Sequence, residues 1–217
     1  MKPKRIILVR HGESEANVDR EIYSKSPDHE IALTATGHEQ SVDTGRKIAA
    51  LIQSESYAVY VSPYARTLQT MKGICGEIAE KPLFVYQDPR LREQDWGVLP
   101  TQEETKRNKD VRDNYSLFFY CFPGGESCAD VFDRMSTFFE TLHRDFQKEK
   151  FPENILIVSH GVAIKCFLAR WFHWEVEHFA LNFNVPNCYT LVMNRNRDSD
   201  RYELTEPFGK GLFSWRI

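Results

Sequence analysis

Two histidines in this chain each follow a short apolar run and each precede a glycine. His11 comes after residues 5–10, and His160 comes just after residues 155–158. Apolar runs of this length are typical of buried strands, and the carboxyl ends of parallel strands meet at one edge of a sheet. We therefore expect the two imidazoles to lie close together, with each glycine allowing a sharp turn and the close approach of a ligand.

Charged side chains that suit a phosphate ester stand at the ends of the same and neighbouring runs. Arg10 ends the first run, Arg66 lies beyond the run 57–61, and Glu93 lies beyond the run 83–86. A phosphomonoester carries about −1.5 to −2 charges at neutral pH, and guanidinium forks match the geometry of its oxygens. The spacing therefore predicts an arginine-lined phosphate pocket with two imidazoles and a carboxylate beside it.

Such a set can transfer a phosphoryl group without a metal ion. One neutral imidazole can attack phosphorus and form a covalent intermediate, and the other can donate to the oxygens as charge spreads over them. A carboxylic acid can protonate the leaving oxygen and then act as base toward water, which is worth roughly 10²–10⁴ in rate. A metal site is the rival interpretation, but neither histidine has a second ligand at His-x-x-x-His spacing or an acidic pair beside it.

The elements that would position these residues alternate along the chain. A Ser-Pro pair at Ser62 predicts an N-cap followed by proline at the first helical position. Strands alternating with helices indicate an α/β fold, a three-layer sandwich whose mostly parallel central sheet is flanked by helices, in one domain over 1–217. We expect strands at 5–10, 57–61, 83–86 and 155–158, a closing strand pair at 189–193 and 202–204, and helices at 37–53, 63–79, 126–148 and 162–171, with 101–121 helical in part.

Composition narrows the setting in which this chemistry would operate. The net charge of −3 offers no global attraction to nucleic acid or anionic membrane, and no apolar run approaches the roughly 20 residues that cross a bilayer. Five cysteines without Cys-x-x-Cys spacing argue against a disulfide framework and a cysteine zinc site. No signal peptide is recognisable. We expect a cytoplasmic protein that acts on a small phosphorylated metabolite, with neither nucleic acid nor membrane as partner, and its oligomeric state stays open.

These motifs together resemble the histidine phosphatase superfamily, also called the phosphoglycerate mutase-like family. The first and last motifs are specific as a pair, and the middle ones fall in the right order along nearly the whole chain. The motifs are Arg10-His11-Gly12-Glu13-Ser14, Leu33-Thr34 with Gly37, Ser62-Pro63 with Arg66 and Thr70, Leu91-Arg92-Glu93-Gln94-Asp95-Trp96-Gly97, Pro123-Gly124-Gly125-Glu126-Ser127 and Val158-Ser159-His160-Gly161.

The resemblance implies the family's α/β fold, no metal or other cofactor, and a phosphohistidine intermediate. By this resemblance His11 is the nucleophile and Glu93 is the acid and base. The phosphate pocket implied in the same way comprises Arg10, Arg66 and His160, with Asn17 as a further phosphate contact and Ser14 and Glu126 as possible members.

The branch of the family is predicted from the segments around the implied proton donor. A mutase must exclude water, and the family's cofactor-dependent mutases have a longer insertion after the proton donor and a basic C-terminal tail. Here the interval from Glu93 to Gly124 is short and residues 209–217 are not strongly basic. We therefore expect a metal-independent phosphatase of phosphomonoesters. The alternatives are a cofactor-dependent phosphoglycerate mutase, a fructose-2,6-bisphosphatase-like enzyme and a catalytically inactive module that binds a phosphorylated ligand.

Two segments, 18–32 and 98–123, are expected to govern recognition of the leaving group. The second contains an aromatic cluster between Tyr115 and Phe122. This cluster either roofs the pocket or packs into the core, and the sequence leaves both open.

Overall fold

The computed structural model describes residues 2–97, 102–180 and 184–206, and within them six strands form one sheet. The strand order is β3-β2-β4-β1-β5-β6, in which the first four strands are parallel and the last two antiparallel. The C-terminal segment 209–217 and residues 98–101, both used above, lie outside the described residues. The strands are β1 (Arg5–Arg10), β2 (Tyr57–Val61), β3 (Val85–Gln87), β4 (Asn154–Ser159), β5 (Thr190–Arg195) and β6 (Tyr202–Leu204).

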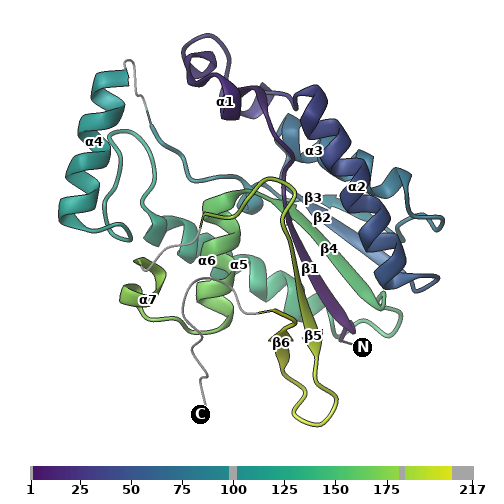
Figure 1. Ribbon diagram of the computed structural model, residues 1–217. Helices are drawn as coiled ribbons and strands as arrows, with labels where there is room; N and C mark the ends of the chain where they lie inside the picture. Colours follow the sequence, from purple (N-terminus) through teal and green to yellow (C-terminus); the bar gives the residue numbers. More distant parts are fainter. Residues whose placement is uncertain (1, 98–101, 181–183, 207–217) are drawn as a thin grey trace.

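Helices cover both faces of this sheet, which confirms the expected three-layer sandwich (Figure 1). Helices α2 and α3 pack on one face, and α5 and α6 pack on the other. The α-helices are α1 (Glu15–Val18), α2 (Ala35–Ile52), α3 (Ala65–Gly76), α4 (Gln102–Tyr115), α5 (Cys128–Asp145), α6 (Gly161–Trp171) and α7 (Val176–Ala180), and the 3₁₀ turns are η1 (Arg20–Ser24), η2 (Asp28–Glu30) and η3 (Pro89–Leu91).

The apolar run of β1 explains why this strand lies in the centre. Ile6 and Leu8 pack in the cluster with α5 and α6, whereas Ile7 and Val9 pack in the cluster with α2 and α3. Side chains alternate between the two faces of a strand, so only a strand covered on both faces buries four consecutive apolar residues. The polar residues at its end are therefore held at the edge of a rigid, fully covered sheet.

One expected helix start was wrong. Helix α3 begins at Ala65 with Tyr64 as its N-cap, and Ser62 does not cap it. The backbone N–H of Ser62 donates to the Val158 carbonyl at 3.0 Å, which continues the pairing of β2 with β4. The Ser62 hydroxyl lies 2.8 Å from Nε2 of His160. The hydroxyl that we predicted to cap the helix therefore contacts a histidine of the candidate site instead.

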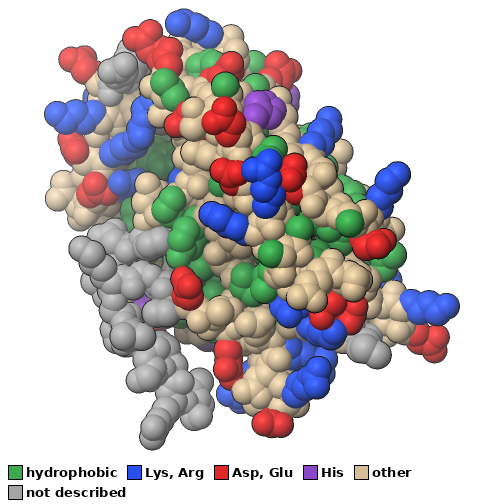
Figure 2. Space-filling model, turned by 45° about the vertical axis from the view of Figure 1, so that its right-hand side comes forward, with side chains coloured by type: hydrophobic (Ala, Val, Ile, Leu, Met, Phe, Trp, Pro, Cys, Tyr) green, Lys and Arg blue, Asp and Glu red, His purple; other side chains and the backbone are tan. Residues whose placement is uncertain are grey.

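The outer surface carries charges of both signs. Figure 2 shows lysine, arginine, aspartate and glutamate side chains interspersed over the face in view. Among the described residues, no helix has both the length and the apolar character needed to cross a membrane.

The aromatic cluster after α4 contributes largely to the core. Phe118 and Phe122 are buried, and the Phe122 ring packs against Trp96 and Tyr120. Tyr115 and Phe119 are exposed. The interpretation as core packing thus applies to the buried members of the cluster.

This division predicts unequal effects of two substitutions. Phe122 is 1% exposed and Phe119 is 55% exposed. We expect Phe122→Ala to lower the free energy of unfolding by about 3–5 kcal/mol, because it removes a fully packed ring and leaves a cavity. Phe119→Ala should change it by less than about 0.5 kcal/mol. Urea unfolding of the two variants measures both values, and equal losses would contradict the assignment of Phe122 to the core.

Candidate active site

The pairing of β1 with β4 brings the two histidines together. The register aligns Arg10 with Ser159, and the backbone N–H of His11 donates to the Ser159 carbonyl at 3.0 Å. The imidazole centroids of His11 and His160 are 5.2 Å apart, with the ring planes at 62°. Both side chains are buried, at 4% and 0% exposed.

A backbone carbonyl determines which nitrogen of the His11 ring carries the proton. Nδ1 of His11 lies 2.7 Å from the carbonyl oxygen of Gly12. A carbonyl oxygen only accepts hydrogen bonds, so Nδ1 carries the proton in the neutral ring and Nε2 keeps a free lone pair. The local backbone thus leaves Nε2 as the ring nitrogen whose lone pair is available for attack.

The surroundings keep both rings neutral. Burial, with the nearby charges of Arg66 and Arg10, holds the pKa of His11 well below its usual range. Burial, with Arg66 and His11 as the next contributors, does the same to the pKa of His160. Desolvation and like charges both disfavour the imidazolium, and the neutral imidazole is the form that can attack phosphorus.

Besides Oδ1 of Asp28, which is ion-paired with Arg66, two buried polar atoms at this place have no hydrogen-bond partner among the described residues. They are Nε of Arg10 and Nδ1 of His160. The Ser62 hydroxyl can donate to Nε2 of His160, which leaves the Nδ1–H of a neutral ring as a donor. Buried polar groups are almost always satisfied, so this pair of donors marks the place where the oxygens of an anion would bind.

Arg66 is held at the same site by Asp28 of η2. Its guanidinium is 3% exposed and pairs with the Asp28 carboxylate at 2.9 Å, and it donates to the Asp28 carbonyl at 2.6 Å. The ring of Tyr64 lies 4.9 Å below the guanidinium carbon and 5.0 Å from the ring of His160. These contacts fix the direction of the second guanidinium.

Glu93 reaches the site at the start of α6. Its carboxylate accepts from the backbone N–H groups of Val162 at 3.1 Å and Ala163 at 3.2 Å. A Cβ placed on Gly161 would lie 3.7 Å from Nε of Arg10 and 3.8 Å from Oε2 of Glu93, so both groups flank that glycine. Five predicted residues therefore converge, namely His11, His160, Arg10, Arg66 and Glu93.

The three remaining predicted residues bond mainly to the protein itself. Oδ1 of Asn17 accepts from the Ser14 backbone at 3.0 Å and the Ser14 hydroxyl at 3.1 Å, which caps α1. The Glu126 carboxylate pairs with Arg92 and with Arg134. Asn17 lies beside the site, and Glu126 holds the segment that carries Glu93.

The loop before β5 is a part of the site that the sequence analysis missed. Nδ2 of Asn187 donates to the His11 carbonyl at 3.1 Å and to Oδ1 of Asn17 at 3.0 Å. The Val185 carbonyl accepts from Nη1 of Arg10. No motif marks this loop, but an antiparallel strand begins at the edge where its parallel neighbours end. This topological rule could have indicated from the sequence that the residues just before β5 lie at the site.

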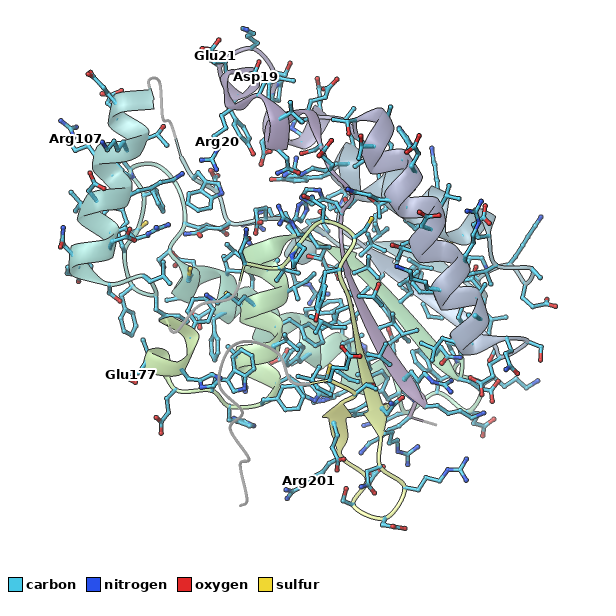
Figure 3. All side chains as sticks on the ribbon, in the orientation of Figure 1. Asp19, Arg20, Glu21, Arg107, Glu177 and Arg201 are labelled. Carbon is cyan, nitrogen blue, oxygen red and sulfur yellow. The ribbon has the colours of Figure 1, made fainter. Side chains whose placement is uncertain are left out.

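Described residues of the two segments expected to govern the leaving group come near one another, namely Arg20 on η1 and Lys109 on α4. We call the space between η1 and α4 the mouth of the site. Burial lowers the pKa of Lys109 on α4, and the charges of Arg20 on η1 and of Arg112 lower it further. The Lys109 ammonium lies 5.7 Å from the centroid of the Trp96 ring. Figure 3 shows Arg20 directed into the space between η1 and α4, and Arg107 directed away from it. Two cations thus approach one another at the mouth.

Comparison with known proteins identifies relatives over nearly the whole chain. The family model of the histidine phosphatase superfamily (branch 1) matches residues 6–206. A phosphoglycerate mutase-like protein of Arabidopsis thaliana is 42% identical over 99% of this chain and 72% of its own length. A broad-range acid phosphatase of Saccharomyces cerevisiae is 28% identical, covering 94% of this chain and 89% of its own.

Solved structures share the fold. A structure from Escherichia coli that bears the name of an α-ribazole-5′-P phosphatase superposes with a TM-score of 0.73 at 23% identity, covering 99% of this chain and all of that one. A mycobacterial glucosyl-3-phosphoglycerate phosphatase superposes with a TM-score of 0.73 at 20% identity, covering 95% of this chain and all of that one. At these identities the likeness establishes the architecture.

The buried neutral histidines predict a loss of stability below neutral pH. The unfolded chain has a histidine pKa near 6.5, so below that value it binds more protons than the folded protein does. The free energy of unfolding should therefore fall as the pH drops from about 7 to about 5, by up to about 1.4 kcal/mol per pH unit for each buried histidine. Urea unfolding should show a shallower slope for His160→Gln, whereas His38→Gln, at an exposed position, should keep the original slope. An unchanged slope in His160→Gln would contradict the buried neutral ring.

Proposed function

Because the chain belongs to the histidine phosphatase superfamily, we propose that it hydrolyses phosphomonoesters of small metabolites through a phosphohistidine on His11, without a metal ion. One observation carries the proposal: a buried, neutral His11 with its lone pair on Nε2 lies near the charges of Arg66 and Arg10 and beside the His160 ring, and Nε of Arg10 and Nδ1 of His160 are buried without a hydrogen-bond partner. No group of three or more His, Cys, Asp or Glu side chains in the described part of the chain is arranged to hold a metal.

The first step forms the covalent intermediate. Nε2 of His11 attacks phosphorus while Arg10, Arg66 and His160 bind the phosphoryl oxygens. The bond from phosphorus to the leaving oxygen breaks, and Glu93 in its protonated form gives that oxygen its proton. The alcohol leaves, and the phosphoryl group remains on His11.

The second step restores the enzyme. The Glu93 carboxylate takes a proton from a water molecule as that water attacks phosphorus. The phosphorus–nitrogen bond breaks, its electron pair returns to Nε2, and inorganic phosphate leaves. Glu93 is again protonated for the next cycle, so protons and charges balance over the two steps.

A phosphoglycerate mutase is the second candidate. The mutase-like name of the Arabidopsis relative favours it, and the acid phosphatase name of the yeast relative favours hydrolysis. The two reactions share the first step and differ in whether water or a second hydroxyl accepts the phosphoryl group. The short interval from Glu93 to Gly124 supports hydrolysis, because it leaves less chain to exclude water.

Phosphorus NMR of 3-phosphoglycerate, with a trace of 2,3-bisphosphoglycerate and excess chelator, tests the proposal. We expect inorganic phosphate to accumulate, and His11→Ala to lower its rate by about 10³-fold or more because the nucleophile is lost. His38→Ala is the matched control. Formation of 2-phosphoglycerate without free phosphate would establish the mutase instead, and loss of activity on chelation would refute the metal-free mechanism. If 3-phosphoglycerate is inert, a panel of phosphate esters replaces it, with the same variants.

The cations at the mouth predict a preference among leaving groups. Arg20 and Lys109 make no ion pair among the described residues, and each lowers the cost of placing an anion between them. We expect Arg20→Glu to lower kcat/KM for 3-phosphoglycerate about tenfold, or about 1.4 kcal/mol, with little change for p-nitrophenyl phosphate. Arg107→Glu makes the same charge change on a side chain directed away, and equal effects of the two variants would contradict this preference.

A further inference from the structure

Arg134 of α5 is hydrogen-bonded to the backbone of the segment that carries Glu93. Its guanidinium donates to the backbone carbonyls of Arg92 at 2.9 Å and Glu93 at 3.1 Å, and also to the carbonyl of Arg90. The side chain is only 10% exposed. A guanidinium that is largely buried and donates to three carbonyls of one segment fixes the path of that backbone.

Glu126 completes this arrangement by binding both Arg134 and the same segment. Its two carboxylate oxygens accept from Nε and Nη2 of Arg134, each at 3.1 Å. The same carboxylate accepts from the backbone N–H of Asp95 at 3.0 Å and pairs with Arg92. The fork of Arg134 and the carboxylate of Glu126 therefore hold the chain on both sides of Glu93.

Backbone and side chain of Glu93 are thus held by different elements. Helix α6 supplies the N–H groups that bind its carboxylate, and α5 supplies Arg134, which binds its backbone. The hydroxyl of Ser159, the residue before His160, donates to the Leu91 carbonyl at 2.7 Å and ties the same segment to β4. The position of the carboxylate relative to the two imidazoles depends on all three supports.

We propose that Arg134, backed by Glu126, is a positioning residue that keeps the Glu93 carboxylate within reach of the leaving oxygen. This inference rests on the proposed role of Glu93 as acid and base. A displacement of about 1 Å in a catalytic group can lower a rate by about 10²-fold. Lysine preserves the charge at this position, but its single ammonium cannot span three carbonyls and a carboxylate.

If the ion pair of Arg134 with Glu126 served only the stability of the fold, its loss would have a different effect on activity. Its loss would lower stability and would lower activity on all substrates alike. A positioning role makes the loss depend on how much the leaving group needs a proton. Alkyl phosphates release a basic alkoxide and need the acid, whereas dinitrophenyl phosphate releases a stable anion and does not.

The experiment compares Arg134→Lys with the unaltered protein on these two substrate types. The parameter is kcat/KM, because it covers the steps up to departure of the leaving group. We expect a loss of about 10- to 100-fold on an alkyl phosphate and of less than about threefold on dinitrophenyl phosphate. Equal losses on both substrates would overturn the proposal.

Two further variants calibrate the result. Glu93→Gln removes the acid and should show the same dependence on the leaving group, to a larger extent. Arg170→Lys is the matched control, because Arg170 also lies between α5 and α6, where its Nε donates to Ser136 at 2.8 Å and its guanidinium lies 5.7 Å from the Phe132 ring. It should leave the ratio of the two substrates unchanged.

The outcomes separate the two hypotheses. If Glu93→Gln shows no dependence on the leaving group, the role of Glu93 in the proposed function fails. If Glu93→Gln shows it and Arg134→Lys does not, only the positioning role fails. Should Arg134→Lys not fold, Glu126→Gln is measured in its place. This variant keeps the side-chain volume and removes the charge that orients the Arg134 guanidinium. Equal losses on both substrates in Glu126→Gln would likewise overturn the proposal.

Discussion

Two imidazoles must stay neutral beside two guanidiniums that stay charged, and the rest of the site follows from that constraint. Burial alone disfavours the imidazolium, and the positive charges of Arg10 and Arg66 disfavour it further. A ring whose pKa is held well below its usual range keeps its lone pair at neutral pH, and the Gly12 carbonyl selects Nε2 as the atom that carries it. The carboxylates of Asp28, which pairs with Arg66, and of Glu93, which lies near Arg10, offset the positive charge of the two guanidiniums.

This constraint requires a rigid sheet edge at which the two imidazoles are buried. Strand β1 lies between β4 and β5, with helices on both faces, so the ends of the strands that carry His11 and His160 have little freedom to move. The loop after β1 packs so closely that a Cβ on Gly12 would lie 2.5 Å from the Gly37 carbonyl oxygen. Glycine at that position lets the start of α2 close the site from one side.

The sequence predicted the parts of the site that depend on strand ends, because a strand's position follows from local apolar pattern. The runs before His11 and His160 placed both residues at one edge. The sequence did not predict the partner of a polar group where several partners are possible and only the fold brings the actual one near. Ser62 could cap a helix or bind an imidazole, and the sequence cannot weigh the two. Asn187 and Arg134 act through backbone carbonyls, which carry no residue-specific signal.

In the proposed mechanism, the groups that act on the phosphoryl group and the groups that would meet the leaving group lie in different parts of the molecule. The converging side chains stand on β1, β4 and the starts of α3 and α6, which belong to the packed sandwich. The cations at the mouth stand on η1 and α4, and Figure 1 shows α4 apart from the sheet. A substitution in α4 can therefore alter the charge met by the leaving group without disturbing the sheet edge. Glu93 is the exception in this mechanism, because as acid and base it would serve both the phosphoryl group and the departing oxygen. The segment that carries it is held by α5, α6 and β4 together, which suits that double role.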